Sequence, residues 1–220
     1  MKKHATEQRR PVIGRSSTLA HATARALLRL GVSPNAVSIG SVLFSAAAGI
    51  CMLFAPSADN LDTVLLLLVS AACIGARLAC NLLDGIMAVE GGHATPSGSF
   101  FNDFPDRISD SVIFVCCGFA CGAGALGHSL GWASALVAAM TAYIRIFGAA
   151  SGLDQDFGGP MAKQHRMLVI AAGCFLSGVE LVVFGFYKTL FVSLVIVFLG
   201  GVMTCIRRGS RLVRSLEGGT

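Results

Sequence analysis

The segment of residues 81–106 reads NLLDGIMAVEGGHATPSGSFFNDFPD. It is a polar, glycine-punctuated segment between two long apolar runs. Carboxylates inside or beside lipid are costly and usually mark a functional site. Asn81 and Asp84 are three residues apart and share one helix face, and Asn102 and Asp106, four apart, do the same. If the intervening loop turns the two helices antiparallel, four oxygen-bearing side chains converge on one hard divalent cation.

The rest of the chain has the composition of a membrane protein. Of its 220 residues, 54% are apolar and only 13% are charged, whereas roughly a quarter of a soluble domain is charged. Six apolar runs come close to the ~20 residues that cross a bilayer; they cover about residues 35–55, 62–83, 100–125, 132–151, 165–186 and 189–206. We therefore expect an all-α integral membrane protein with six transmembrane helices. The eight cysteines fall in apolar segments and are expected to act as small hydrophobic residues.

The net charge of +5 gathers near the two ends of the chain. Six spans return both ends to one side of the membrane, which the positive-inside rule makes cytosolic. The same rule explains the basic ends, so no nucleic-acid partner is expected. We predict a protein of the bacterial cytoplasmic membrane with its active site and both termini in the cytosol. The predicted parts are a basic tail (1–15), an amphipathic juxtamembrane helix on the inner leaflet (16–31), a six-helix domain (32–208) and a C-terminal tail (209–220).

The spacing in residues 81–106 resembles the signature of the CDP-alcohol phosphotransferase family, Asp-x2-Asp-Gly-x2-Ala-Arg-x8-Gly-x3-Asp-x3-Asp. Every interval agrees. The positions that keep the family residue are Asp84, Gly85, Ala88, Gly98 and Asp106. Three positions depart, because Asn81 and Asn102 replace aspartates and Val89 replaces an arginine.

This resemblance implies an enzyme of phospholipid biosynthesis. It would transfer a phosphatidyl group from CDP-diacylglycerol, or a substituted phosphate from a related CDP-alcohol, to an alcohol acceptor and release CMP. The implied cofactor is Mg²⁺ or Mn²⁺, which polarises the pyrophosphate. Asp106 would accept the proton of the attacking hydroxyl. The implied metal ligands are Asp84, Asn81, Asn102 and Asp106, with Asp103 as a substitute beside Asn102. Since amides carry no charge, we expect weaker metal binding, with one tight ion in place of the family's two.

The resemblance also implies two substrate sites. Candidate contacts for CDP are Asn35, Asn81, Gly85, Ala88 and Gly98; Asn35 belongs to a Ser33-Pro34-Asn35-x2-Ser38 segment similar to the family's Thr-Pro-Asn-x2-Thr. Candidate contacts for the acceptor are Arg145, Lys163 and Arg166, which favour a phosphorylated polyol. Positive-inside flanking explains Lys163 and Arg166 about equally well, whereas Arg145 lies deeper in its apolar run. Asp110 is expected to form a structural ion pair with Arg77.

Three alternatives remain beside this interpretation. A degenerate family member would bind a CDP-lipid without turnover. A small transporter would use Asp84 and Asp106 in a polar pathway and would have helices broken near mid-membrane. An aromatic-type prenyltransferase would need a second acidic motif, for which Asp154 and Asp156 have the wrong spacing. The small-residue face formed by Ser41, Ser45 and Gly49 allows close helix pairing within one chain or in a homodimer.

Overall fold

The computed structural model describes residues 17–89 and 97–218, and all regular elements within those residues are helical. The all-α prediction is therefore confirmed. The elements are α1 (Thr18–Arg29), α2 (Pro34–Phe54), the 3₁₀ turn η2 (Ala55–Ser57), α3 (Asn60–Val89), α4 (Gly98–Ala120), α5 (Gly124–Ala150), α6 (Lys163–Phe184) and α7 (Thr189–Glu217).

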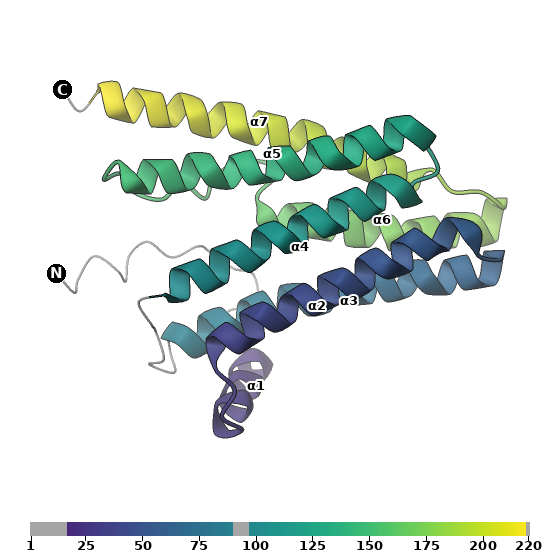
Figure 1. Ribbon diagram of the computed structural model, residues 1–220, viewed down its shortest axis with the longest axis horizontal. Helices are drawn as coiled ribbons and strands as arrows, with labels where there is room; N and C mark the ends of the chain where they lie inside the picture. The colour runs from purple at the N-terminus through teal and green to yellow at the C-terminus, as the bar shows by residue number, and fades with distance from the viewer. Residues whose placement is uncertain (1–16, 90–96, 219–220) are drawn as a thin grey trace.

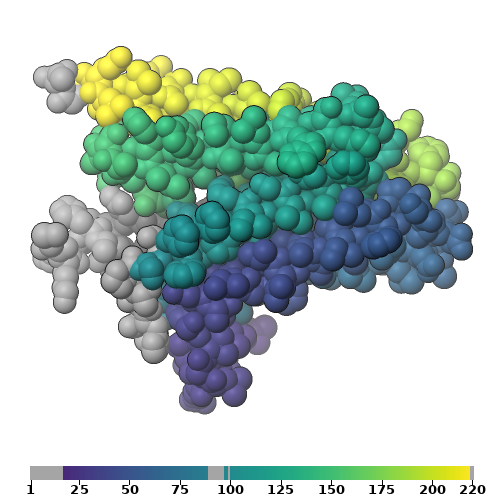
Figure 2. Space-filling view, in the orientation of Figure 1, coloured from purple at the N-terminus to yellow at the C-terminus, as the bar shows by residue number. Residues whose placement is uncertain are grey.

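Six long helices pack as a closed ring. In order around the ring, α2 contacts α3, α3 contacts α6, α6 contacts α7, α7 contacts α5, α5 contacts α4, and α4 returns to α2. The helices run side by side along the long axis of the molecule (Figure 1). Figure 2 shows α4 seated between α5 and α2 on the visible face. The apolar core inside the ring comes from every side of it and includes Met52, Ile74, Phe114, Met167 and Leu194, all fully buried.

Length and composition make five of the described helices candidate membrane spans. They are α2 together with η2, α3, α5, α6 and α7. The remaining long helix, α4, has 23 residues, but its first 13 residues include Asp103, Asp106, Arg107 and Asp110. Length and composition thus identify five spans instead of the predicted six. The helix left out is α4, because it carries the charged residues of the site. The several apolar helices support an integral membrane protein.

The first helix lies across the direction of the others (Figure 1). It buries Ala24 in a small apolar cluster with Val37, Ile86 and Met87, at the end of the ring where α2 begins and α3 ends. Gly31 follows it with φ +77°, a left-handed conformation that ends a helix at little cost for glycine. The helix that was predicted over 16–31 is therefore seen as Thr18–Arg29.

Small residues bring α4 very close to its two neighbours. A Cβ atom added to Gly118 would lie 2.5 Å from the carbonyl oxygen of Gly127 on α5, and one added to Gly49 would lie 2.9 Å from Cys116 Sγ on α4. Gly49 thus packs on α4 within one chain, and Ser41 and Ser45, on the same helix as Gly49, are also buried. The homodimer stays a prediction that this face does not support.

The last helix is longer than the sequence suggested. The sixth span was expected to stop near residue 206, but α7 continues through Arg207 and Arg208 to Glu217. Arg208 is buried, so the positive charges at this end belong partly to the interior of the bundle.

Candidate active site

Two carboxylates of the motif are buried at the same end of the ring. Asp84, near the end of α3, is 4% exposed, and Asp106, in the first half of α4, is 3% exposed. The hydroxyl of Ser38 on α2 donates a hydrogen bond of 2.5 Å to Asp84 Oδ2. Asp84 also lies within Coulombic range of both Asp106 and Lys163. The motif spacing therefore brings its two remaining aspartates into one interior space.

Both oxygens of Asp106 face cationic groups. Lys163, the first residue of α6, donates a hydrogen bond from Nζ to Asp106 Oδ2. On the other side, Arg77 Nη2 of α3 lies 3.3 Å from Asp106 Oδ1. Asp106 is thus held between two positive charges that come from facing helices.

Asp110 lies one helical turn after Asp106 on α4 and is hydrogen-bonded to two other helices of the ring. Its Oδ1 accepts a hydrogen bond of 2.6 Å from Arg77 Nη2, which confirms the predicted ion pair. Its Oδ2 accepts one of 3.0 Å from Arg166 Nη2 on α6, and Arg166 Nη1 donates to Thr141 Oγ1 on α5 at 2.9 Å. The partly exposed Arg107 lies at 3.9 Å from the same Oδ2. Four helices are thereby cross-linked by charge-assisted hydrogen bonds around one buried carboxylate.

The other predicted metal ligands occupy different surroundings. Asn81 is half-buried, and its Nδ2 has no hydrogen-bond partner. Asn102 is exposed. Asp103 pairs with Arg145 Nη2 at 2.7 Å. Within the described residues, no group of three or more His, Cys, Asp or Glu side chains is placed to hold a metal ion, since asparagines stand at two motif positions.

The donors nevertheless fit one hard divalent cation. Asp84 and Asp106 supply carboxylate oxygens. The orphaned amide of Asn81 can present its oxygen instead, because the two ends of an amide are assigned only from their hydrogen bonds. Two charged oxygen donors and one neutral donor suit Mg²⁺ or Mn²⁺ better than a softer metal.

The candidate contacts for CDP lie at the same end of the ring. A Cβ at Gly85 would have nothing within 4 Å, so there is open space beside the α3 backbone next to Asp84. Asn35 is half-buried in the first turn of α2, Ala88 is half-buried near the end of α3, and Gly98 opens α4. Ser33 caps α2 by accepting a hydrogen bond from the Ala36 amide at 3.2 Å.

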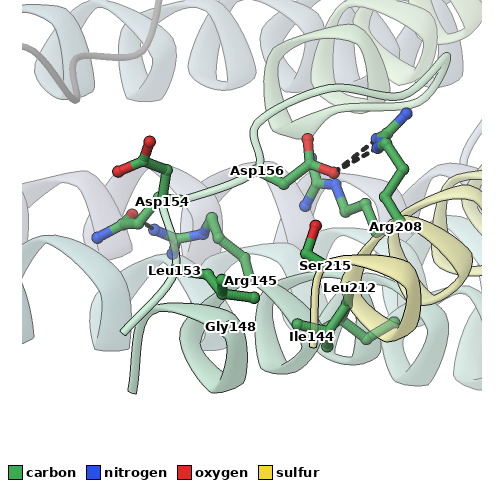
Figure 3. Close-up of a pocket in the computed structure, with 11 residues that line it drawn as sticks. Ile144, Arg145, Gly148, Leu153, Asp154, Asp156, Arg208, Leu212 and Ser215 are labelled. Carbon is green, nitrogen blue, oxygen red and sulfur yellow. Dashed lines mark hydrogen bonds and ion pairs between the residues drawn. The ribbon is translucent and has the colours of Figure 1, made fainter. Parts of the chain in front are cut away.

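A cavity of about 410 Å³ with a mixed polar and apolar lining lies between α5, the loop after it and the last turns of α7 (Figure 3). Its polar lining is formed by Arg145, Asp154, Gln155, Asp156, Arg208, Arg211 and Ser215. Arg145 Nη1 donates to Gln155 Oε1 at 2.5 Å, and Arg211 pairs with Asp156 at 2.7 Å. The lining holds three guanidinium groups and two carboxylates, and Arg145 is also paired with Asp103, so an anion would bind here by taking over guanidinium groups that are already hydrogen-bonded.

The structure separates the three residues predicted to bind the acceptor. Arg145 lines the cavity, Lys163 lies on Asp106, and Arg166 is buried against Asp110. Arg208 and Arg211 belong to the basic C-terminal end, which the positive-inside rule alone would explain. Their signal was present in the sequence, because positions 204, 208, 211 and 215 repeat at helical spacing, as on one face of a helix that extends past residue 206.

Known proteins similar to this chain include several named phosphatidylinositol phosphate synthase. No family model matches the chain. The chain is 31% identical to a phosphatidylinositol phosphate synthase of Mycobacterium marinum over 157 residues, which are 70% of the chain and 63% of that relative. It is 28% identical to the protein of the same name from Mycolicibacterium smegmatis over 193 residues, which are 86% of the chain and 82% of that relative. The first alignment thus spans just under two thirds of the relative's length.

Solved structures show the same fold. The crystal structure of Mycobacterium tuberculosis phosphatidylinositol phosphate synthase in complex with manganese and citrate matches with a TM-score of 0.72 at 24% identity, covering 88% of each chain. The structure of the same protein with CDP-DAG bound matches with a TM-score of 0.71, covering 88% of this chain and 93% of that one. These relatives confirm the resemblance to the CDP-alcohol phosphotransferase family. Within that family, the proteins to which this chain is similar are phosphatidylinositol phosphate synthases.

Proposed function

We propose that this chain transfers the phosphatidyl group of CDP-diacylglycerol to a phosphorylated polyol and releases CMP, as a step in phospholipid biosynthesis. The name of its relatives points to an inositol phosphate as the acceptor. The observation that carries the proposal is the joint burial of Asp84 and Asp106, at the family spacing, at the end of the ring that also holds the arginine-lined cavity.

In this proposal Asp84, Asp106 and Asn81 hold a single Mg²⁺ or Mn²⁺, which when bound neutralises charge on the pyrophosphate. Asp106 accepts the proton of the attacking hydroxyl, and release of its Oδ2 from the Lys163 ammonium would make it a stronger base. Asn102 and Asp103 are weaker candidates, because one is exposed and the other is engaged by Arg145.

The remaining candidates bind the two substrates. The open space at Gly85 admits the nucleotide, with Asn35, Asn81, Ala88 and Gly98 around it. In the cavity, Arg145 binds the acceptor's phosphate with help from Arg208 and Arg211. Lys163 and Arg166 act from the interior, where they neutralise Asp106 and Asp110.

Six spans, α2 to α7, cross the bacterial cytoplasmic membrane in this proposal, and α1 lies on the inner leaflet. The charges of α4 do not contradict a span, because Asp106 and Asp110 are turned into the ring and paired there. The basic residues Arg25, Arg29, Arg207 and Arg211 all lie at the end of the bundle that holds the site. The positive-inside rule makes this end cytosolic.

A second candidate is a protein that binds a CDP-lipid without turning it over. Two observations favour it: asparagines replace two acidic positions of the motif, and Lys163 occupies the candidate base. The transporter alternative finds less support, because α2 to α7 are each continuous in the described residues.

The test is CMP release by the purified protein in lipid nanodiscs with CDP-diacylglycerol, Mg²⁺ or Mn²⁺, and a panel of acceptors. The panel contains inositol phosphate, inositol, glycerol 3-phosphate and serine. Asp84→Ala serves as the inactive variant, and Asp62→Asn, an exposed residue at the other end of α3, serves as the matched control. CMP release with a phosphorylated acceptor supports the first candidate. Binding of CDP-diacylglycerol without CMP release for any acceptor supports the second.

A further inference from the structure

We infer that Lys163 is a built-in counter-ion of the metal site, which holds Asp106 at rest and is displaced when the divalent cation binds. Lys163 would then set the affinity of the site for metal. The inference rests on the proposed function only in taking Asp84 and Asp106 as ligands of that cation.

The contacts of Asp106 show which cationic group can leave. Its two oxygens face Lys163 and Arg77, so a divalent cation on Oδ2 would share that oxygen with the ammonium and would repel it at close range. Arg77 is fixed, because its side chain is fully buried and its Nη2 is also bonded to Asp110 at 2.6 Å. Lys163 is 11% exposed, opens α6 and has a flexible stem; among the described residues, Asp106 is the acceptor of its ammonium.

The charge balance explains why this chain needs such a group. The buried carboxylates Asp84, Asp106 and Asp110 face the cations Arg77, Lys163 and Arg166. These buried groups balance without a metal, and the partly exposed Arg107, 3.9 Å from Asp110, adds a further positive charge at the edge of the cluster. The family signature has carboxylates at positions 81 and 102, where each would add a negative charge for the metal to neutralise. With asparagines there, a divalent cation adds an excess of positive charge, and releasing Lys163 to solvent relieves part of it.

Displacement by the cation would also give Lys163 a second role, in substrate binding. Once displaced, its ammonium is available to an anionic substrate, which is the role that its position in the sequence first suggested. Metal binding and acceptor binding would then be linked through one side chain.

The test is Mn²⁺ binding to the detergent-solubilised protein without substrates, measured by the electron paramagnetic resonance signal of free Mn²⁺. For Lys163→Met we expect a Kd at least ~10-fold lower than for the wild type, since a repelling charge at ligand distance is removed. Lys163→Arg should bind Mn²⁺ as weakly as the wild type. Lys188→Met, at an exposed lysine before α7, is the control and should leave the Kd unchanged.

An unchanged or higher Kd in Lys163→Met overturns the inference while leaving the metal site in place. No Mn²⁺ binding by either the wild type or Lys163→Met overturns both the inference and the metal site of the proposed function. If Lys163→Met does not fold, acetylation of the wild-type protein decides. Mn²⁺ should raise the labelling of Lys163 several-fold relative to Lys188, and equal labelling with and without Mn²⁺ contradicts displacement.

Discussion

Replacing Asp110 with asparagine should strongly destabilise the bundle. Asp110 accepts charge-assisted hydrogen bonds of 2.6 Å from Arg77 and 3.0 Å from Arg166. Each such bond contributes roughly 1.5–3 kcal/mol, and breaking a buried ion pair typically costs about 3–5 kcal/mol because a charge is left unpaired. Asparagine keeps one acceptor oxygen and removes the charge. We therefore expect the free energy of unfolding of Asp110→Asn to fall by about 3 kcal/mol, the lower end of that range.

The assay is denaturant unfolding in mixed micelles, followed with a thiol-reactive dye that labels buried cysteines such as Cys117 and Cys174 as they become exposed. Asp62→Asn is the control; it removes an exposed carboxylate from the first turn of α3, which is worth about 1 kcal/mol at most. Adding Arg166→Met to Asp110→Asn should recover part of the loss, since it removes an unpaired buried charge. A loss for Asp110→Asn no larger than that of the control refutes the idea that this carboxylate holds four helices together.

The other predictions concern activity and metal binding. Asp84→Ala should abolish CMP release, as should excess chelator with the wild-type protein; full activity in chelator contradicts a role for the cation. Asp106→Asn should lower turnover by ~10²–10⁴-fold with little change in the affinity for CDP-lipid; the opposite pattern in kinetics and nucleotide binding would make Asp106 a ligand only. Arg145→Ala should mainly raise the KM for the acceptor, because its guanidinium lines the cavity; a raised KM for CDP-diacylglycerol alone speaks against this placement. The double variant Asn81→Asp and Asn102→Asp should lower the Kd for Mn²⁺, chiefly through position 81, which is half-buried; an unchanged Kd in calorimetry shows that another group already supplies the charge.

The sequence predicts the fold and one pair of the site well, because both depend on local spacing. Apolar length defines the helices, and the motif intervals place Asp84 and Asp106 on the inner faces of α3 and α4. The pair of Arg77 with Asp110 could also be predicted, since an isolated charge of each sign within apolar runs calls for a partner.

Contacts between segments distant in sequence could not be predicted in this way. The hydrogen bond from Ser38 to Asp84 joins α2 to α3, and that from Lys163 to Asp106 joins α6 to α4. Neither has a periodic signal. The exposure of Asn102 could not be predicted either. Asn102 and Asp106 share a helix face, but the sequence does not show at which turn of α4 that face becomes buried in the ring.

The close contact of Gly118 on α4 with Gly127 on α5 fixes the position of α4 at the end of the bundle away from the site. At Gly118 the two backbones leave no space for even one methyl group. Asp106 lies twelve residues earlier on the same helix, about 18 Å away at the rise of an α-helix. A larger side chain at Gly118 would push α4 away from α5 at this contact. The resulting tilt of α4 would move Asp106 away from Lys163 and Arg77. Residues that never meet a substrate can therefore affect the alignment of Asp106 from the opposite end of α4.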